Sequence, residues 1–361
     1  MPLREGQQVG PYVIKEQLGQ GGMAIVYRAY HARLDRYVAI KVLHTLLLND
    51  PTLKARFERE AQIIARLKHP NIVPVYDFNE FEGQLYLVMQ QIEGQPLKVS
   101  MTNKPMPLSD TIRIMTIAAG ALDYAHEKGV MHRDIKPSNI ILDDEGAPHL
   151  MDFGLARLVH AGPSTLSADA VLGTPQYMSP EQARGVGDLD RRTDIYSFGI
   201  VLYEMITGRV PFNGMTPLSI IHNHINDPVP KPTTINPKLP IAVENVLLKA
   251  LAKKPADRYS TTMELMDAFR AAAEKKRSTQ PIARTQENTS EVAQQSSSLN
   301  SVLLQMREHF KATRGHVRRK PRRPKTAVPG TKQVKITHGH WQKAPYIPAQ
   351  RVADKEWGMG E

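Results

Sequence analysis

The sequence contains no cysteine, so disulfide bonds, thiolate metal sites and cysteine nucleophiles are excluded. It also lacks a long hydrophobic run, because no uncharged apolar stretch approaches the roughly 18 residues of a membrane span. The most apolar window, residues 195–206, contains Glu204 and is typical of a buried helix. The N-terminus lacks the basic and then apolar order of a signal peptide. We therefore expect a cytoplasmic protein without a transmembrane segment.

Net charge is absent from most of the chain and concentrated near its end. Residues 271–361 hold 18 of the 47 Lys and Arg residues but only 7 of the 36 Asp and Glu residues, which accounts for the whole net charge of +11. A neutral body argues against nucleic-acid binding by the folded part. The length of 361 residues predicts about two domains, or one two-lobed domain followed by a tail.

Residues 132–139, His-Arg-Asp-Ile-Lys-Pro-Ser-Asn, combine an acid, a cation and an amide within one short segment. A hydroxyl that attacks a phosphate needs a carboxylate to orient it, a cation for the transferred charge and an oxygen ligand for a metal. Asp134, Lys136 and Asn139 are of the right types for these three roles. The same residue types also make ordinary turns, so the other parts of such a site must decide between the two interpretations.

A glycine-rich segment, residues 18–24, lies between two predicted strands near the N-terminus. It is either a flexible hairpin or a loop whose backbone N–H groups approach a phosphate closely. A dinucleotide-binding turn is the poorer interpretation, because a strand and not a helix follows, and because Ala24 stands where a third glycine is expected.

Two charged residues stand inside apolar runs, where an uncompensated charge is costly. Lys41, in the predicted strand 37–43, needs phosphate oxygens or a carboxylate as its partner. The predicted helix 52–67 offers Glu60, which is otherwise an ordinary surface charge. Asp152 lies between apolar residues and a glycine, which indicates either metal binding or capping of backbone N–H groups.

The order of predicted elements indicates an α+β fold with two lobes. Strands and one helix predominate before residue 89, a polar connector covers residues 90–94, and helices predominate afterwards. We predict a small antiparallel-sheet N-lobe and a larger, mainly helical C-lobe. Residues 155–177 form a Ser-, Thr-, Gly- and Pro-rich loop that is longer than a passive connection requires, so it is a candidate regulator.

Together these motifs resemble a protein kinase domain, specifically a bacterial Hanks-type serine/threonine kinase, over residues 10–272. The motifs that carry the resemblance are Gly19-x-Gly21-Gly22, Val38-Ala39-Ile40-Lys41, Glu60, His132-Arg133-Asp134, Asn139, Asp152-Phe153-Gly154 and Ser179-Pro180-Glu181. The resemblance divides the chain into an N-terminal extension (1–9), an N-lobe (10–89), a hinge (90–94), a C-lobe (95–272) and a tail (273–361).

The resemblance implies transfer of the ATP γ-phosphate to protein Ser or Thr hydroxyls. Asp134 would accept the hydroxyl proton and Lys136 would steady the γ-phosphate. Lys41 would pair with Glu60 and hold the α- and β-phosphates. The metal ions would be Mg²⁺, with Mn²⁺ as an alternative, and their ligands would be Asn139 and Asp152.

The resemblance also implies an ATP site between the lobes. The glycine-rich loop over the phosphates would comprise Gly19, Gln20, Gly21, Gly22, Met23 and Ala24. The adenine would lie between Leu18, Val26, Ala39 and Ile141. Backbone groups of Gln90 and Ile92 would hydrogen-bond to it, Met89 would be the gatekeeper, and Glu93 would contact the ribose. A Gln90-Gln91 pair replaces the more usual Glu-Tyr of the connector, which matters little where the backbone makes the contacts.

Regulation is expected at the long loop, where Arg133 offers a cation to a phosphate of about −2 charge. The candidate phosphoacceptors are Ser164, Thr165 and Ser167, and we expect self-association for autophosphorylation. Thr174 resembles a threonine that bridges Asp134 and Lys136. Three residues have structural roles by resemblance: Asp194 anchors the catalytic loop, and Glu181 pairs with Arg258.

The tail changes to Ser, Thr, Gln, Pro, Lys and Arg, so we expect it to be mostly disordered, with a short helix at 298–311. Residues 314–325 hold eight basic residues, counting His316. They are either a solvated spacer or a site for acidic lipid, nucleic acid or an acidic protein, and lipid binding would place the protein peripherally at a membrane. A pseudokinase or scaffold acting through this tail is the alternative to an active kinase.

Overall fold

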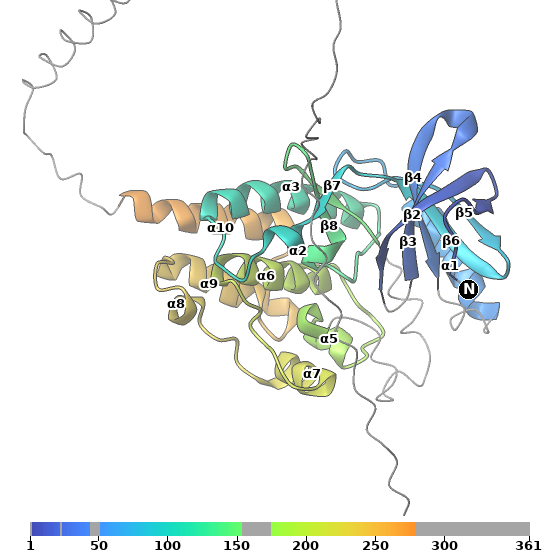
Figure 1. The fold of residues 1–361 in the computed structure, drawn as a ribbon. Coiled ribbons are helices and arrows are strands. Elements are labelled where there is room, and N and C mark those ends of the chain that lie inside the picture. Colours follow the sequence, from blue (N-terminus) through green and yellow to red (C-terminus); the bar gives the residue numbers. More distant parts are fainter. Residues whose placement is uncertain (1, 22–23, 44–50, 154–174, 279–361) are drawn as a thin grey trace, which may run out of the picture. The chain divides into compact units, whose positions relative to one another are not determined.

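The computed structural model describes residues 2–21, 24–43, 51–153 and 175–278. By its contacts the chain divides into a unit of residues 1–283 and a unit of residues 284–361. All described residues belong to the first unit, in which strands gather on one side and helices on the other (Figure 1). The predicted two-lobed α+β fold is therefore confirmed. The basic run of the tail and its predicted helix lie outside the described residues.

The N-lobe is an antiparallel sheet of six strands in the order β1-β2-β3-β4-β6-β5. Its strands are β1 (Gln8–Val9), β2 (Tyr12–Gln20), β3 (Ala24–His31), β4 (Arg36–Leu43), β5 (Val75–Phe81) and β6 (Gln84–Gln90), with a 3-10 turn, η1 (Ala32–Leu34). Side chains alternate between its two faces. One face packs Tyr27, Ile40 and Val88 together, and the other carries Ala39 and Met89.

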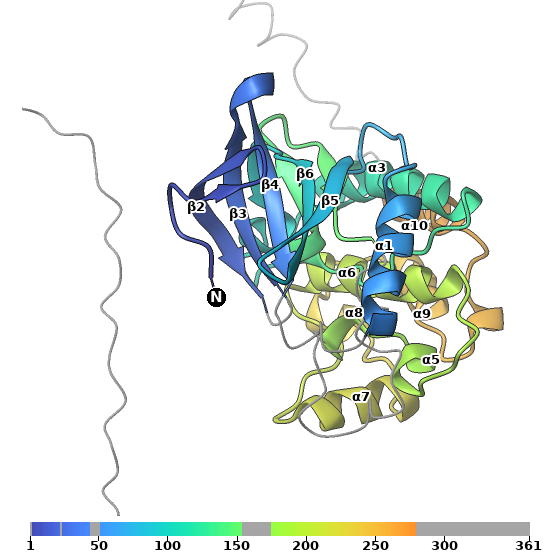
Figure 2. The same cartoon turned by 90° about the vertical axis from the view of Figure 1, so that its right-hand side faces the viewer.

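Helix α1 (Pro51–Ile64) covers the second face of this sheet (Figure 2). Phe57 and Ala61 are buried there with Leu43 and Leu87, so the apolar stripe of the helix meets the strand that carries Lys41. This packing places the helix that carries Glu60 over the sheet face on which Ala39 and Met89 lie.

The predicted N-terminal extension is part of the N-lobe. Val9 is fully buried and Leu3 nearly so, and β1 pairs with the start of β2. The Leu3 N–H donates to the Tyr27 hydroxyl at 3.0 Å. The predicted boundary at residue 10 came from the extent of the kinase resemblance, while the structure buries Leu3 and Val9 in the sheet core.

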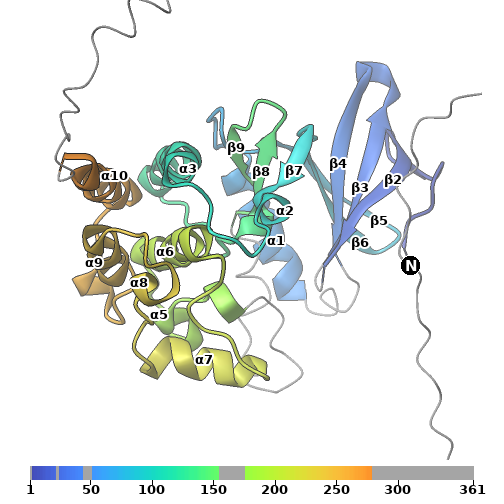
Figure 3. The same cartoon turned by 60° about the vertical axis from the view of Figure 1, so that its left-hand side comes forward.

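A small second sheet lies where the lobes join (Figure 3). Its strands are β7 (Gly94–Pro96), β8 (Ile140–Asp143) and β9 (Pro148–Leu150). It brings the hinge beside the segments that follow the catalytic loop, because Pro96 pairs with Ile141. An isolated bridge between Ile72 and Leu150 ties it to the N-lobe side.

The C-lobe is built around α6 (Arg192–Thr207), in which every residue from 193 to 207 is buried. A helix buried on all sides is central to a core, as the hydrophobic window 195–206 indicates. The helices around it are α2 (Leu97–Ser100), α3 (Leu108–Glu127), α5 (Pro180–Ala183), α7 (Pro217–Asn226), α8 (Pro232–Ile235), α9 (Ile241–Ala250) and α10 (Thr262–Ser278). Three 3-10 turns, η3 (Pro137–Asn139), η4 (Pro175–Tyr177) and η5 (Pro255–Asp257), complete the described elements.

The last described helix runs beyond the predicted domain boundary at residue 272. Helix α10 continues to Ser278, and the compact unit to residue 283. The Ala-Ala-Glu-Lys-Lys run after residue 271 consists of strong helix formers, which continue a helix already docked through Leu265 and Phe269.

Candidate active site

The acid, cation and amide of the catalytic loop converge. Lys136 Nζ lies 2.7 Å from Asp134 Oδ2, and Asn139 Nδ2 donates to the same oxygen at 3.0 Å. Asn139 Nδ2 also donates to the Asp134 carbonyl at 2.8 Å, so the amide holds the loop closed. The Asp134 carboxylate is thus fixed in place and about one-third exposed, as a group that must meet a substrate requires.

Asp194 fixes the backbone of this loop through two hydrogen bonds. It is fully buried on α6 and accepts the His132 N–H at 2.8 Å and the Arg133 N–H at 2.6 Å. Arg133 has a φ of +64°, a conformation costing on the order of 1–3 kcal/mol in a non-glycine residue. Gln182 Nε2 donates to the Arg133 carbonyl at 2.9 Å, so both sides of the strained residue are held.

His126, on α3, is a site residue that the sequence interpretation missed. Its Nε2 lies 2.7 Å from Asp194 Oδ2, while the Asp123 carboxylate lies 3.7 Å from its Nδ1. Burial favours the neutral ring, but the two carboxylates outweigh it and raise the pKa of His126 to about 9. The protonated imidazole therefore balances the Asp194 charge. His126 could have been found in the sequence as a titratable residue on the apolar side of the predicted helix.

Asp152 and Lys41 form the second charged centre. Lys41 Nζ lies 2.8 Å from Asp152 Oδ2, and both side chains are mostly buried. Asp152 has a φ of +66°, and its Oδ1 is buried with no hydrogen-bond partner among the described residues. A buried carboxylate oxygen left in this way is chemically suited to a cation. The metal role expected of Asp152 stays a prediction.

The chain around Asp152 is coupled to the catalytic loop. Phe153 packs against the His132 ring with centroids 4.5 Å apart, and burial lowers the pKa of His132. The Met151 N–H donates to the Asn139 carbonyl at 3.0 Å. These contacts hold the backbone segments that carry Asn139 and Asp152, the two expected metal ligands, side by side.

The pair expected between Lys41 and Glu60 stays a prediction. Glu60 is half-buried on α1, and Lys41 stands between Val26 and Leu87 in the sheet. The carboxylate seen beside the Lys41 ammonium is that of Asp152.

The predicted adenine site is an apolar patch between the lobes. Ala39 and Met89 are buried neighbours across β4 and β6, and Val26 and Ile92 pack against the same cluster. Met151 joins this cluster and was not predicted, because only the fold brings it beside Ala39. Of the other predicted ATP-site residues, Leu18, Gln90 and Glu93 are exposed and Ile141 is half-buried.

The glycine-rich segment forms a hairpin, as the alternation of β2 and β3 predicts. The Gly21 N–H donates to the Ala24 carbonyl at 2.9 Å, and Gly19 pairs with Val26. No atom would meet a Cβ at Gly19 within 4 Å. Gln20 is exposed at the end of β2. Gly22 and Met23 lie outside the described residues, as do Gly154, Ser164, Thr165, Ser167 and Thr174.

Glu181 and Arg258 form a buried two-point ion pair. Arg258 Nη1 and Nη2 donate to the two Glu181 oxygens at 2.7 and 2.8 Å, and Thr193 Oγ1 donates to one of them at 2.9 Å. Although burial opposes ionisation, Arg258 holds the pKa of Glu181 below its usual value. The pair joins α5 to the turn before α10.

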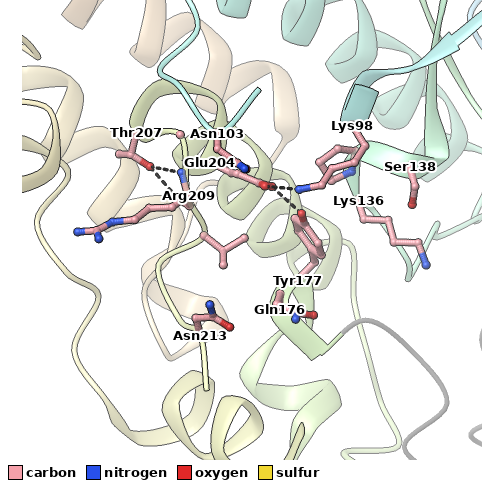
Figure 4. A pocket seen from close by; sticks show the side chains of 13 residues that line it. Lys98, Asn103, Lys136, Ser138, Gln176, Tyr177, Glu204, Thr207, Arg209 and Asn213 are labelled. Atoms are coloured by element: carbon pink, nitrogen blue, oxygen red, sulfur yellow. Dashed lines mark hydrogen bonds and ion pairs between the residues drawn. The ribbon is translucent and has the colours of Figure 1, made fainter. Parts of the chain in front are cut away.

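A cavity of about 600 Å³ borders the catalytic loop (Figure 4). Lys136 and Ser138 line one side of it, and Glu204 and Thr207, at the end of α6, line another. The sequence interpretation did not predict this cavity, because its walls come from segments about a hundred residues apart.

The fold is that of the two-lobed protein kinase class. The sequence matches the protein kinase domain family over residues 12–305. The chain belongs to this family, among the bacterial Hanks-type serine/threonine kinases, as the motifs predict.

Named relatives support this placement. The serine/threonine-protein kinase PknB of Mycobacterium leprae is 45% identical over 260 residues, which cover 70% of this chain and 42% of that protein. PrkC of Bacillus subtilis is 43% identical over 257 residues, 71% of this chain and 39% of that protein. The chain thus spans about two fifths of the length of these relatives.

A solved structure agrees with the sequence comparison. The crystal structure of a double mutant of the Mycobacterium tuberculosis PknI kinase domain has a TM-score of 0.64 and 32% sequence identity. The match covers 76% of this chain and all of that one. Within the described residues no helix is long and apolar enough to cross a membrane.

Proposed function

We propose that this chain is an active kinase that transfers the γ-phosphate of ATP to Ser or Thr hydroxyls of proteins. The observation that carries the proposal is the convergence on Asp134, whose carboxylate is fixed by Lys136 and Asn139 and still partly exposed. A pseudokinase would not need this arrangement, and each catalytic motif position holds a residue able to perform its role.

Asp134 orients the substrate hydroxyl and takes up its proton as the oxygen attacks phosphorus. Lys136, already beside this carboxylate, places its positive charge where the transferred phosphoryl group passes. Lys41 binds phosphate oxygens of the nucleotide, and the adenine occupies the apolar patch of Ala39 and Met89.

Asp152 and Asn139 would hold a divalent metal ion, for which we propose Mg²⁺ with Mn²⁺ as a substitute. The metal supplies charge neutralisation at the phosphates. The described residues contain no group of three or more His, Cys, Asp or Glu side chains that could hold a metal alone. Mg²⁺ is the ion proposed because it is usually bound through one or two carboxylates and substrate phosphates.

Transfer of labelled γ-phosphate by the wild type and by Asp134→Asn tests the function. The amide keeps the size of the side chain but cannot accept the proton, so we expect transfer to fall at least about a hundredfold. The exposed Asp188→Asn is the matched control and should retain full activity. Equal transfer by wild type and Asp134→Asn would end the catalytic assignment.

We propose that phosphorylation of the long loop activates the enzyme, through self-association of two copies. Arg133 supplies the cation for the loop phosphate, and its backbone is fixed by Asp194 and Gln182. Replacing Ser164, Thr165 and Ser167 together with Ala should lower kcat about tenfold or more. Unchanged kinetics in the triple variant, after mass spectrometry has shown the wild-type loop to be phosphorylated, would refute the proposal.

The tail is proposed to bind an acidic partner through residues 314–325, with acidic lipid, nucleic acid and acidic protein as the candidates. A lipid partner would place a cytoplasmic enzyme at the membrane surface. The support is the charge distribution, since the body is neutral and the tail carries the net charge of +11.

A further inference from the structure

The cavity beside the catalytic loop contains a buried carboxylate that is already paired. The Glu204 side chain is only 6% exposed, and Lys98 Nζ lies 2.7 Å from its Oε1. The Tyr177 hydroxyl donates to its Oε2 at 2.5 Å. Burial, together with the Glu204 charge, raises the pKa of Tyr177, which keeps this hydroxyl protonated. Both carboxylate oxygens are therefore engaged within the chain (Figure 4).

The cavity lies within reach of a protein substrate. Lys136 lines it and also bonds Asp134, so the cavity is one side chain away from the acceptor position. An extended peptide advances about 3.3 Å per residue, so a residue within a few positions of the acceptor hydroxyl reaches the cavity. This step rests on the proposed kinase function.

Lys98, together with Lys136 and Arg209 on the same cavity wall, sets the charge that such a substrate residue meets, and Lys98 is the cation paired with Glu204. A buried carboxylate beside the acceptor site would by itself select arginine or lysine, because a cation removes the cost of its burial. Here the cation comes from α2 of the same chain. The Lys98 side chain is half-exposed, so it faces the open cavity as well as Glu204. An incoming basic residue must displace Lys98, whereas an acidic residue is attracted to it.

We propose that Lys98 is a specificity-determining residue. By pairing with Glu204, it prevents this carboxylate from binding basic substrate residues, so the cavity favours acidic or neutral residues near the phosphoacceptor. Amide side chains of Asn103 and Asn213 on the cavity wall can donate hydrogen bonds to an acidic side chain. Selection against basic residues, by repulsion from Lys98, is as much a part of this specificity as attraction.

Three matched peptide series test the proposal, with Arg, Ala or Asp placed in turn at each position within four residues of one acceptor serine. We expect the wild type to have its lowest kcat/KM on the Arg peptide at one or more positions. Lys98→Met should raise the Arg-to-Ala ratio of kcat/KM there by about tenfold and lower the Asp-to-Ala ratio. Lys98→Arg, which keeps the charge, should preserve the wild-type order.

Two controls separate specificity from a structural role. The exposed Lys254→Met, in the same lobe but away from the cavity, should leave all ratios unchanged. Adding Glu204→Gln to Lys98→Met should abolish the gain on the Arg peptide, because the freed carboxylate is what attracts arginine. A purely structural role of Lys98 would lower kcat/KM on all three peptides by the same factor and would overturn the proposal.

A binding measurement distinguishes failure of this inference from failure of the kinase function. Fluorescent versions of the peptides are titrated into Asp134→Asn protein with and without Lys98→Met. A rise of about tenfold in relative affinity for the Arg peptide supports the inference even if no transfer is detected. Equal Arg-to-Ala affinity ratios in the two proteins overturn it, whatever the transfer assay shows.

Discussion

At the scale of single residues, buried charges position the catalytic loop. Asp194 binds two successive backbone N–H groups, which holds Arg133 at its left-handed φ. Such a carboxylate is tolerated in the core because His126 balances its charge and the two N–H groups bond to it. The backbone strain at Arg133 is therefore offset by the hydrogen bonds and the ion pair of Asp194. This strained residue adjoins Asp134, which is proposed to orient the substrate hydroxyl.

His126 predicts a pH dependence of stability. Its pKa is raised from 6.5 to about 9 in the folded protein, so its contribution is fully present below about pH 6.5 and is lost as pH rises through 9. We expect the free energy of unfolding of the wild type to fall by up to about 3 kcal/mol over this range. In His126→Gln the fall should be much smaller, as measured by denaturant unfolding at several pH values.

The exposed His222→Gln serves as the control and should show the wild-type slope. If His126→Gln lost stability with pH as steeply as the wild type, the ion pair with Asp194 would not be the source of the effect.

At the scale of elements, the hinge depends on a close approach between two strands. Gly94 begins β7 with a φ of +154° and pairs with Asp143 of β8. A Cβ at Gly94 would overlap the Leu142 carbonyl oxygen and would lie 2.8 Å from Asp143 Cα. Only glycine allows both this backbone conformation and this contact.

Gly94→Ala should destabilise the protein by about 3 kcal/mol, because β7 must move away from β8 or distort. Since Gly94 adjoins Glu93 and Ile92, nucleotide affinity should fall as well. Thermal unfolding and titration with a fluorescent nucleotide measure the two effects.

Gly187→Ala is the control, because Gly187 is exposed and no atom would meet the new Cβ within 4 Å. It should change stability by less than about 0.5 kcal/mol. Similar stability of the two variants would contradict the prediction.

At the scale of the whole molecule, chemistry and net charge are separated along the chain. The described unit carries the proposed catalytic residues, whereas the net charge of +11 arises after residue 270. Attraction between such a run of cations and a polyanion weakens as salt rises, while contacts within the folded unit respond much less.

Deleting residues 314–325 should weaken binding to duplex DNA and to anionic vesicles by at least about tenfold at low salt, since each neutralised charge adds to the affinity. The wild type should lose most of this binding when salt is raised. Deleting residues 286–297, a segment of equal length without Lys or Arg, is the control. Unchanged binding after the first deletion would identify the basic run as a solvated spacer.

The family, the two lobes and the chemical types of the proposed site residues can be inferred from the amino-acid sequence alone. These follow from local patterns, such as the alternation around residues 18–30, the apolar run of α6 and the motif that contains Asp134. The sequence also placed the excess charge in the tail, because counting charges requires no fold.

Which charged groups meet in space depends on the folded structure. Three ion pairs join residues that lie 68 to 111 positions apart in the sequence: Lys41 with Asp152, His126 with Asp194, and Lys98 with Glu204. Periodicity reports which face of an element is apolar, but it carries no information on the partner across the core. For that reason the catalytic loop could be predicted from the sequence, while the charge that a substrate meets beside it could not.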